Sequence, residues 1–359
     1  MKWSINLGSI LGVRFRVHLT FLLLLAFIAY VGYVDNGGLV GAAGGVLFMC
    51  ALFFCVTVHE MSHSLMAMRF GVQVESIMLL PIGGVAQMRS IPEDALQELL
   101  ISAVGPLTSV GIFAVMAIVL RPTTHEILAV EPFTLQPRLF LTSLMSVNLL
   151  LGIFNLIPAF PTDGGRLFRG LLALAMDFDT ATRIAVTVGQ IFAVLLVFVG
   201  VLYSLWLVLI GFFIFLGASS EGQRIKLRRA LREARVRDVM ATMYRVMSPE
   251  EPLITAYQDV IRGAQDDFPV AGDGQYLGMV PRSAVLAAAR DHRLDLLAGQ
   301  RAVVGLPPVD PGEDLYAVYR RMVEERYTVL PVVAEGRMVG LISQDGISRY
   351  FSLQQATRR

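Results

Sequence analysis

The sequence predicts a multi-pass α-helical membrane domain of six spans, followed by a smaller soluble α/β part that contains two repeats. The composition indicates the membrane domain, because a mean hydropathy of +0.62 with 55% apolar and 16% charged residues is not typical of a soluble protein. The charge distribution indicates the division. Residues 1–218 hold 21 charged side chains and residues 219–359 hold 38. We therefore expect a membrane domain at 1–219, a basic juxtamembrane linker at 220–237 and a soluble part at 238–359.

Long uncharged stretches predict the spans, since a helix needs about 20 apolar residues to cross the hydrocarbon core. The stretches that reach or approach this length are 17–34, 36–59, 99–120, 139–162 and 184–220. As a single helix the last would be about 55 Å long, at about 1.5 Å per residue, which is too long for one crossing. We expect it to form a hairpin of two spans that turns near 200–204.

The positions of Lys and Arg predict the orientation of the spans. With six spans, the basic clusters before the first, after the second, between the fourth and fifth and after the sixth all fall on one face. Arg121 and Arg138 are the exceptions. We therefore expect a plasma or inner membrane protein with both termini in the cytoplasm. The basic run at 224–237 is interpreted as an anchor on anionic lipid, and a net charge of +1 gives no general field for nucleic acid.

Residues 71–92 follow the second span and are apolar but irregular. β-branched residues alternate at Val72 and Val74, and Gly83-Gly84 interrupts the pattern, which predicts a Gly-rich re-entrant loop or β-hairpin. Such backbone is tolerated at membrane depth only where it lines a cavity or is buried in protein. We therefore expect this loop to lie beside an active site.

The soluble part repeats itself with an offset of 62 residues. The segments 268–270 and 330–332 correspond, as do 278–280 and 340–342. Each pair reads as two strands joined by a short turn and followed by a helix, which predicts two copies of one small α/β unit. The expected copies span about 238–290 and 300–355.

The sequence His59-Glu60-Met61-Ser62-His63 ends the uncharged stretch 36–59. His59 and His63 are four residues apart, so on a helix they share one face and can reach the same metal ion, with Glu60 placed to take a proton from bound water. The alternative is a pair of histidines hydrogen-bonded within a helix bundle. Polar groups in a span are costly and usually functional, which favours the zinc interpretation.

Asp163 is the candidate for a third ligand, because catalytic zinc takes three protein ligands and keeps one position open. It follows the stretch 139–162, where Pro158 and Pro161 would end a helix and Gly164-Gly165 would allow a tight turn. This places its carboxylate level with the end of the second span. The alternative is an Asp that caps a helix at the membrane interface.

With these two segments the chain resembles the site-2 protease family of intramembrane zinc metalloproteases. The resemblance covers the membrane part: HExxH on one span, N-x-x-P-x-x-P-x-D-G-G about 100 residues later, and a Gly-rich loop between them. It implies one catalytic Zn²⁺ held by His59, His63 and Asp163, with Glu60 activating water.

The resemblance also implies residues that contact substrate. Asn155 would hold substrate, although a helix–helix hydrogen bond is the alternative role for it. Gly83 and Gly84 lie in the loop that we expect to pair with an extended substrate as an added strand. Family members often carry Asn three residues after a Gly-Pro pair in the third span. Here Ser109 follows Gly105-Pro106 instead.

The soluble part resembles a tandem CBS module, which implies an adenine nucleotide such as ATP as ligand and a homodimer formed through the CBS domains. The usual pattern places Thr or Ser three residues after a glycine and Asp six residues after it. Ser343 fits, whereas Asp345 comes one residue early, and the first repeat has Pro281 and Ala284 at these positions. Ser343 and Asp345 are the candidate nucleotide ligands. A scaffold or dimerisation role without nucleotide is the alternative.

Together the two resemblances imply regulated intramembrane proteolysis near the cytoplasmic face. The substrates would be membrane-tethered proteins, such as transcription factor or sigma factor precursors or anti-sigma factors. One alternative is a CBS-regulated transporter or channel whose histidines line an ion path, and another is an inactive relative that only holds substrate. The distant Asp163 argues against the first and the intact Glu60 argues against the second.

Overall fold

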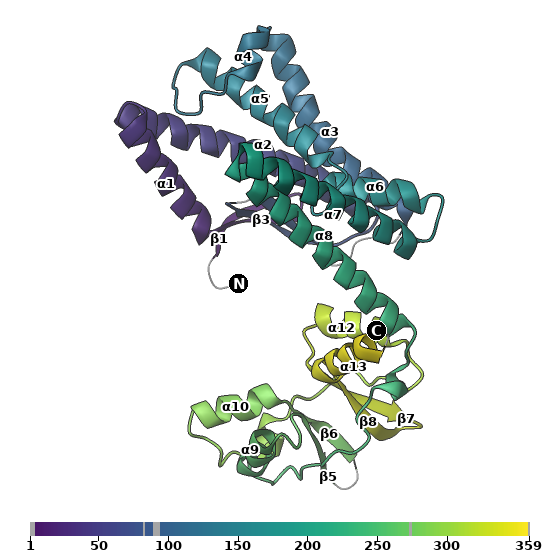
Figure 1. Cartoon of the computed structure of the whole chain (residues 1–359). Helices are drawn as coiled ribbons and strands as arrows, with labels where there is room; N and C mark the ends of the chain where they lie inside the picture. Colours follow the sequence, from purple (N-terminus) through teal and green to yellow (C-terminus); the bar gives the residue numbers. More distant parts are fainter. Residues whose placement is uncertain (1–3, 82, 89–93, 273–274, 358–359) are drawn as a thin grey trace. The chain divides into compact units, whose positions relative to one another are not determined.

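The computed structural model describes residues 4–81, 83–88, 94–272 and 275–357. The chain forms two compact units, Met1–Gln223 and Arg224–Arg359. Figure 1 traces the chain through both. The helices of the N-terminal unit, the last of which extends into the second unit, are α1 (Leu19–Asp35), α2 (Leu39–Arg69), α3 (Ala95–Leu120), α4 (Thr124–Leu128), α5 (Pro137–Asn155), α6 (Asp163–Ala173), α7 (Phe178–Tyr203) and α8 (Leu205–Arg232).

Among the described residues, five helices are long and apolar enough to cross a membrane, namely α2, α3, α5, α7 and α8. Helix α1 is apolar as well but has only 17 residues. The stretch 184–220 is divided at Ser204, where α7 ends and α8 begins, as the excess length required. That six helices each cross the membrane stays a prediction.

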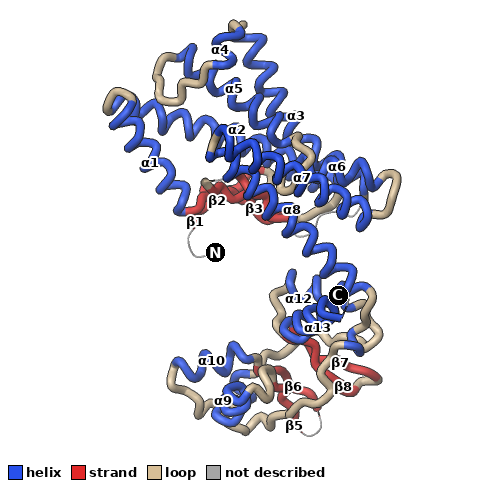
Figure 2. The backbone as a smooth tube through the Cα atoms, in the orientation of Figure 1, coloured by secondary structure: helices blue, strands red, loops and turns tan. Residues whose placement is uncertain are grey.

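A four-stranded sheet with the order β1-β2-β3-β4 lies against α2. Its strands, drawn in red in Figure 2, are β1 (Ser4–Ile10), β2 (Val13–His18), β3 (Val74–Leu80) and β4 (Gly83–Met88). Strands β3 and β4 form an antiparallel hairpin within the Gly-rich stretch, and β2 pairs with β3 in parallel. Strands β1 and β2 were not predicted from the sequence.

Burial explains why the N-terminal residues join this sheet. Alternate residues of β2, Val13, Phe15 and Val17, are buried together with Ile77 of β3 and Phe53 of α2. A strand with one buried face satisfies its backbone through its neighbours and covers apolar surface on one side. The sheet therefore holds the β3–β4 hairpin against the helix that carries the HExxH sequence.

The C-terminal unit contains two antiparallel hairpins that repeat one another. Its elements are η1 (Val236–Asp238), α9 (Leu253–Arg262), β5 (Phe268–Gly272), β6 (Gln275–Val280), α10 (Arg282–Arg290), α11 (Ala298–Arg301), α12 (Leu315–Glu324), β7 (Val329–Ala334), β8 (Arg337–Ser343) and α13 (Gln344–Thr357). The register is interrupted at 270–271 in one hairpin and at 332–333 in the other, an offset of 62 residues in both. The backbone thus has the period that the sequence predicts.

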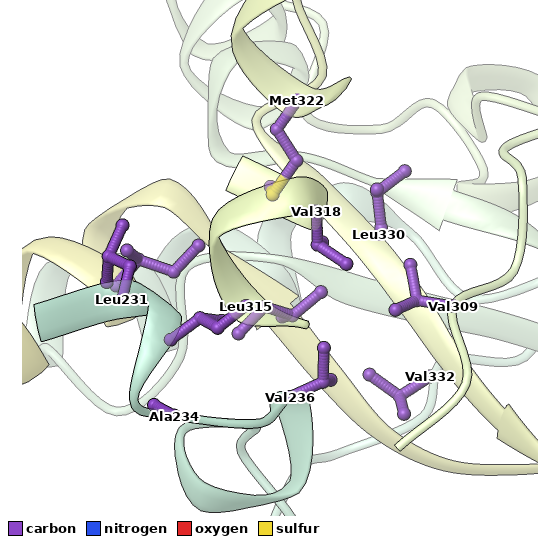
Figure 3. Close-up of a cluster of buried hydrophobic side chains, with 11 residues drawn as sticks. Leu231, Ala234, Val236, Val309, Leu315, Val318, Met322, Leu330 and Val332 are labelled. Carbon is purple, nitrogen blue, oxygen red and sulfur yellow. The ribbon is translucent and has the colours of Figure 1, made fainter. Parts of the chain in front are cut away.

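Each repeat has its own hydrophobic core. Leu231, Val236, Leu315 and Leu330 belong to the core of the second repeat, part of which is shown in Figure 3. The stretch 220–237, which we expected to be a linker, is helical as far as Arg232 and contributes apolar side chains to this core.

Candidate active site

The histidines of the HExxH sequence are buried side by side near the end of α2. Their side chains are nearly inaccessible, with His59 3% and His63 5% exposed, and their ring centroids are 4.9 Å apart. Both lie on the face of α2 that meets α3. Because their spacing is one helical turn, the two Nε2 atoms come within 3.2 Å of each other.

Asp163 is the first residue of α6 and brings a carboxylate to the same point. Thr162 precedes the helix, and its hydroxyl donates to the carbonyl oxygens of Ile157 at 2.7 Å and Ala159 at 2.8 Å. A Cβ on Gly164 would come within 2.3 Å of the Ile157 oxygen. The glycine after Asp163 therefore lies in the first turn of α6, where it permits close packing of the preceding loop rather than forming the turn we expected.

The three candidate ligand atoms form a nearly regular triangle. Oδ2 of Asp163 lies 3.2 Å from Nε2 of His59 and 3.1 Å from Nε2 of His63. Ligands bound about 2.0–2.1 Å from a tetrahedral zinc ion are about 3.3–3.4 Å from one another. The spacing of these atoms fits such an ion, and among the described residues this is the His, Cys, Asp and Glu group that could hold a metal.

The other nitrogen of each imidazole is bound by α3, which orients both rings. Nδ1 of His63 donates to the backbone carbonyl of Ile101 at 2.6 Å, and Nδ1 of His59 is hydrogen-bonded to the Ser109 hydroxyl at 2.9 Å. A carbonyl can only accept, so a neutral His63 carries its proton on Nδ1 and directs the Nε2 lone pair toward the metal position.

Gly105 leaves the space in which the two imidazoles meet. A Cβ at this position would lie 2.1 Å from Nε2 of His63 and 2.7 Å from Nε2 of His59. Any side chain here would clash with both imidazoles at the nitrogens that face the metal. Gly105 and Ser109 lie one turn apart on α3, so one face of this helix both clears and supports the site.

A cavity of about 260 Å³ opens beside the triangle. Its walls come from α2, α3, α6 and β4, and it is lined by Glu60, His63, Asp163 and Arg166 together with Gly84 of β4. The approach of β4 is close, because a Cβ on Gly84 would lie 2.5 Å from Cγ of Glu60. The HExxH carboxylate and an edge strand therefore border the same small cavity.

Sequence comparison identifies relatives of this arrangement. The profile of peptidase family M50 matches residues 47–127 and 128–199, and that of the CBS domain matches residues 303–353. A zinc metalloprotease from Methanocaldococcus jannaschii is 31% identical over 357 residues, which cover 98% of this chain and 97% of the relative. The chain belongs to the site-2 proteases, peptidase family M50. It is therefore a zinc metalloendopeptidase with a C-terminal CBS region.

Two further proteins are similar to this chain. Rip3 of Mycobacterium tuberculosis is 29% identical over 381 residues, with 97% of this chain and 93% of Rip3 covered. The solved structure of the site-2 protease from Methanocaldococcus jannaschii is 37% identical, covers 61% of this chain and 95% of its own, and gives a TM-score of 0.44.

The remaining residues expected to hold substrate in this site-2 protease lie at different places. Gly84 lines the cavity, whereas Gly83, with φ of +132°, has no atom within 4 Å of an ideal Cβ. Asn155 is the last residue of α5 and is not among the described residues that line the cavity. Their contacts with substrate stay predictions.

Part of the protease site was not predicted from the sequence. Ser109 departs from the family pattern, but its hydrogen bond to His59 was not predicted, and no role in the site was predicted for Gly105 or Arg166. The available signal was a glycine and a hydroxyl residue one helical turn apart on the third span, Gly105 and Ser109. The partner of Ser109 could not be identified without the packing of α3 on α2.

The CBS region contains a larger cavity of about 430 Å³. It is lined by residues of both repeats, among them Ser343, Asp345, Asp266, Asp267 and Arg349. Burial raises the pKa of Asp267, and the neighbouring carboxylates of Asp266 and Asp345 raise it further. This cavity is therefore acidic around Asp267, with Arg349 as a cation on its wall.

Proposed function

We propose that the protein performs regulated intramembrane proteolysis, cleaving membrane-tethered proteins close to the cytoplasmic face. His59, His63 and Asp163 would hold one Zn²⁺ and Glu60 would act as general base. The observation that carries this proposal is the convergence of the three ligand atoms, 3.1–3.2 Å apart, at the wall of a cavity that Glu60 lines.

The roles of the side chains follow from their positions. A zinc ion bound here would acidify a water molecule and polarise the scissile carbonyl. Glu60 borders the same cavity, so its carboxylate can take the proton from that water and return it to the leaving amine. Arg166 also lines the cavity and places a positive charge near the reacting groups.

The edge of β4 gives a place for the substrate backbone. This strand ends the described sheet and pairs with β3 on one side. An extended peptide can add to such an edge through backbone hydrogen bonds, which would set its scissile bond beside Glu60. A helical substrate would first have to unwind at this point, since helical amides already have partners within the helix.

The proposed topology has six spans, with both termini in the cytoplasm of a plasma or inner membrane. Five helices long enough to cross and the shorter apolar α1 support the number, and the basic clusters support the orientation. Substrates would be single-span proteins, such as tethered transcription factors, sigma factor precursors or anti-sigma factors.

We also propose that the CBS region regulates the protease by binding an adenine nucleotide in the cavity that Ser343 and Asp345 line. The Ser343 hydroxyl accepts the backbone N–H of Gly346 at 3.0 Å, which fixes this end of the cavity. Dimerisation through the CBS region without nucleotide is the alternative, and titration of the purified protein with ATP would separate the two.

Reconstitution of the protein with a single-span substrate tests the protease activity. Wild type should bind one zinc per chain and cleave, whereas Glu60→Gln should retain zinc and cleave at least 100-fold more slowly, because general base catalysis contributes about 10²–10⁴-fold. Cleavage that survives this substitution, or a wild type without zinc, would refute the proposal. A transporter would instead move ions regardless of Glu60.

A further inference from the structure

Arg169 is a charged side chain buried inside the membrane unit. It lies on α6, six residues after Asp163, and is 3% exposed. Its guanidinium faces two carboxylates from other helices, Glu98 of α3, which is 1% exposed, and Glu221 of α8. These three residues are called the Arg169 cluster.

Hydrogen bonds and aromatic contacts hold the guanidinium of Arg169 in one orientation. Nε of Arg169 donates to both carboxylate oxygens of Glu98 at 3.1 Å, its Nη2 donates to the same carboxylate, and its Nη1 donates to Glu221 at 2.5 Å. The guanidinium also lies 5.0 Å from the ring centroid of Phe160 and 4.8 Å from that of Phe178. These contacts hold several N–H donors of the planar guanidinium in place together.

Stability alone does not explain such a cluster. Removing charges from water is costly, and a protein with well-packed apolar residues of similar volume in place of a buried ion pair is often equally stable or more stable. A buried ionic group does, however, have few alternative partners, so it favours one register of the helices that supply it. The benefit of the Arg169 cluster would then be the placement of what these helices carry.

The elements joined by Arg169 are those that place the candidate ligands. Glu98 precedes Ile101 by three residues on α3, and the Ile101 carbonyl orients His63. Phe160 belongs to the loop that leads into Asp163, and Arg169 itself lies about 9 Å along α6 from Asp163, at about 1.5 Å per residue. A shift of α6 against α3 would therefore move Asp163 relative to both histidines.

Glu221 adds a third helix to this arrangement. It lies on α8, which continues without interruption to Arg232. Ten residues after Glu221, Leu231 belongs to the core of the C-terminal unit. The carboxylate that completes the cluster is thus carried by the same helix that enters the CBS region.

We propose that Arg169 is a positioning residue, which holds α6 in register with α3 so that Asp163 completes the metal triangle, and that Glu221 links this register to α8. The inference deepens the proposed function, since it rests on His59, His63 and Asp163 being the zinc ligands. It requires neither a particular substrate nor proteolysis of one.

The test compares zinc binding by Arg169→Lys, Glu221→Gln and wild type, using the full-length protein in detergent and a chelator as competitor. Lys keeps the charge but cannot donate to both carboxylates in one plane, so we expect zinc affinity to fall about tenfold or more. Glu221→Gln should lower it in the same direction by a smaller factor. In the cobalt-substituted protein, the visible spectrum of both variants should differ from that of wild type.

Arg138→Lys is the matched control. Arg138 also forms a bidentate ion pair with a glutamate, since its Nε and Nη2 donate to the two carboxylate oxygens of Glu126 at 2.6 Å and 3.1 Å. Arg138 is exposed, however, and lies outside the metal site. It should leave zinc affinity and the cobalt spectrum unchanged. Hydrogen–deuterium exchange of the metal-free proteins supplies a separate readout, with faster exchange of α6 expected in Arg169→Lys and in the harsher Arg169→Met.

The proposal is overturned if Arg169→Lys and Glu221→Gln bind zinc with wild-type affinity and give the wild-type cobalt spectrum. It is also overturned if Arg138→Lys alters zinc binding as much as Arg169→Lys does. A wild type that binds zinc but cleaves nothing would count against the proposed function, while the order of zinc affinities would still decide the role of Arg169.

Discussion

The hydroxyl of Ser109 lies 2.9 Å from Nδ1 of His59, a residue 50 positions earlier in the chain. Both side chains are buried, Ser109 fully so. The hydrogen bond connects α3 to the HExxH helix and fixes the orientation of one candidate zinc ligand. Loss of such a partner of a metal-binding imidazole typically costs about 10- to 100-fold in metal affinity or activity.

Ser109→Ala should therefore lower zinc affinity about 10- to 100-fold, because His59 would lose the partner that orients its ring. Competition with a chelator measures the effect. Ser146→Ala is the control, since this buried serine on α5 donates to the carbonyl of Thr142 in its own helix. Equal zinc affinities of the two variants would contradict the role given to Ser109.

Gly105→Ala should abolish zinc binding and cleavage while leaving α3 intact. The new methyl group would lie 2.1 Å from Nε2 of His63, in the space that a metal ion requires. Alanine favours a helix over glycine by about 1 kcal/mol, so the loss would not come from weakening α3. Gly111→Ala on the same helix has no atom within 4 Å and should behave as wild type. Atomic absorption measures the zinc content of both variants, and equal zinc contents would contradict the role given to Gly105.

Gly84→Ala should slow cleavage about tenfold or more and leave zinc affinity close to that of wild type. Its Cβ would lie 2.5 Å from Cγ of Glu60, so either β4 or the carboxylate has to move. Glu60 is the proposed general base, so displacing its carboxylate should lose part of the roughly 10²–10⁴-fold that such a base contributes. Single-turnover cleavage and zinc content are measured together. Loss of zinc in step with activity would argue that Gly84 supports the metal site instead.

Proline substitutions at Val85 and Ala86 test the edge of β4. The N–H groups of neighbouring strand residues point to opposite sides, so one proline removes a hydrogen bond to β3 and the other removes a donor from the free edge. We expect the edge-facing proline to raise KM with zinc and hairpin retained. Unchanged cleavage by that variant would exclude strand addition of the substrate.

Asp267→Asn should stabilise the CBS region at pH 7. Burial raises the pKa of Asp267 above its ordinary value of about 3.9, so the folded state holds the proton more tightly than the unfolded state. The stabilisation from this group is complete below about pH 3.9 and is lost as pH rises through the folded pKa. Asparagine can still accept the N–H of Arg282 and carries no charge.

The difference in stability between Asp267→Asn and wild type is measured by urea unfolding of the full-length protein, with hydrogen exchange of β5 and β6 as the readout. The free energy of unfolding of Asp267→Asn should exceed that of wild type at pH 7, and this difference should shrink toward pH 4. Asp295→Asn, at an exposed position, serves as the control and should change neither value. A gain that is equal at both pH values would exclude ionisation of Asp267 as its cause.

The sequence anticipated the parts of the fold that depend on local pattern. Uncharged length predicts the long helices, and the excess length of 184–220 requires the break found at Ser204. The 62-residue offset between Pro269 and Pro331 predicts the two hairpins, which share even the position of their register shift. By contrast, β2 was missed because it pairs with β3, whose residues lie 62 positions later, and β1, which pairs only with β2, was missed with it.

The sequence by itself indicated which residues are the candidate reactive groups. His59, Glu60 and His63 follow from the spacing of one helical turn and from the cost of placing polar side chains in an apolar span, and Asp163 follows from the Pro- and Gly-containing segment that ends the stretch 139–162. Only the tertiary structure decided what surrounds them: Ser109 hydrogen-bonded to one imidazole, Gly105 beside both, Gly84 against Glu60, and the Arg169 cluster further along α6 from Asp163. The physical reason is that a ligand set is specified by residue type and spacing, whereas its support comes from the close packing of helices that are distant in sequence.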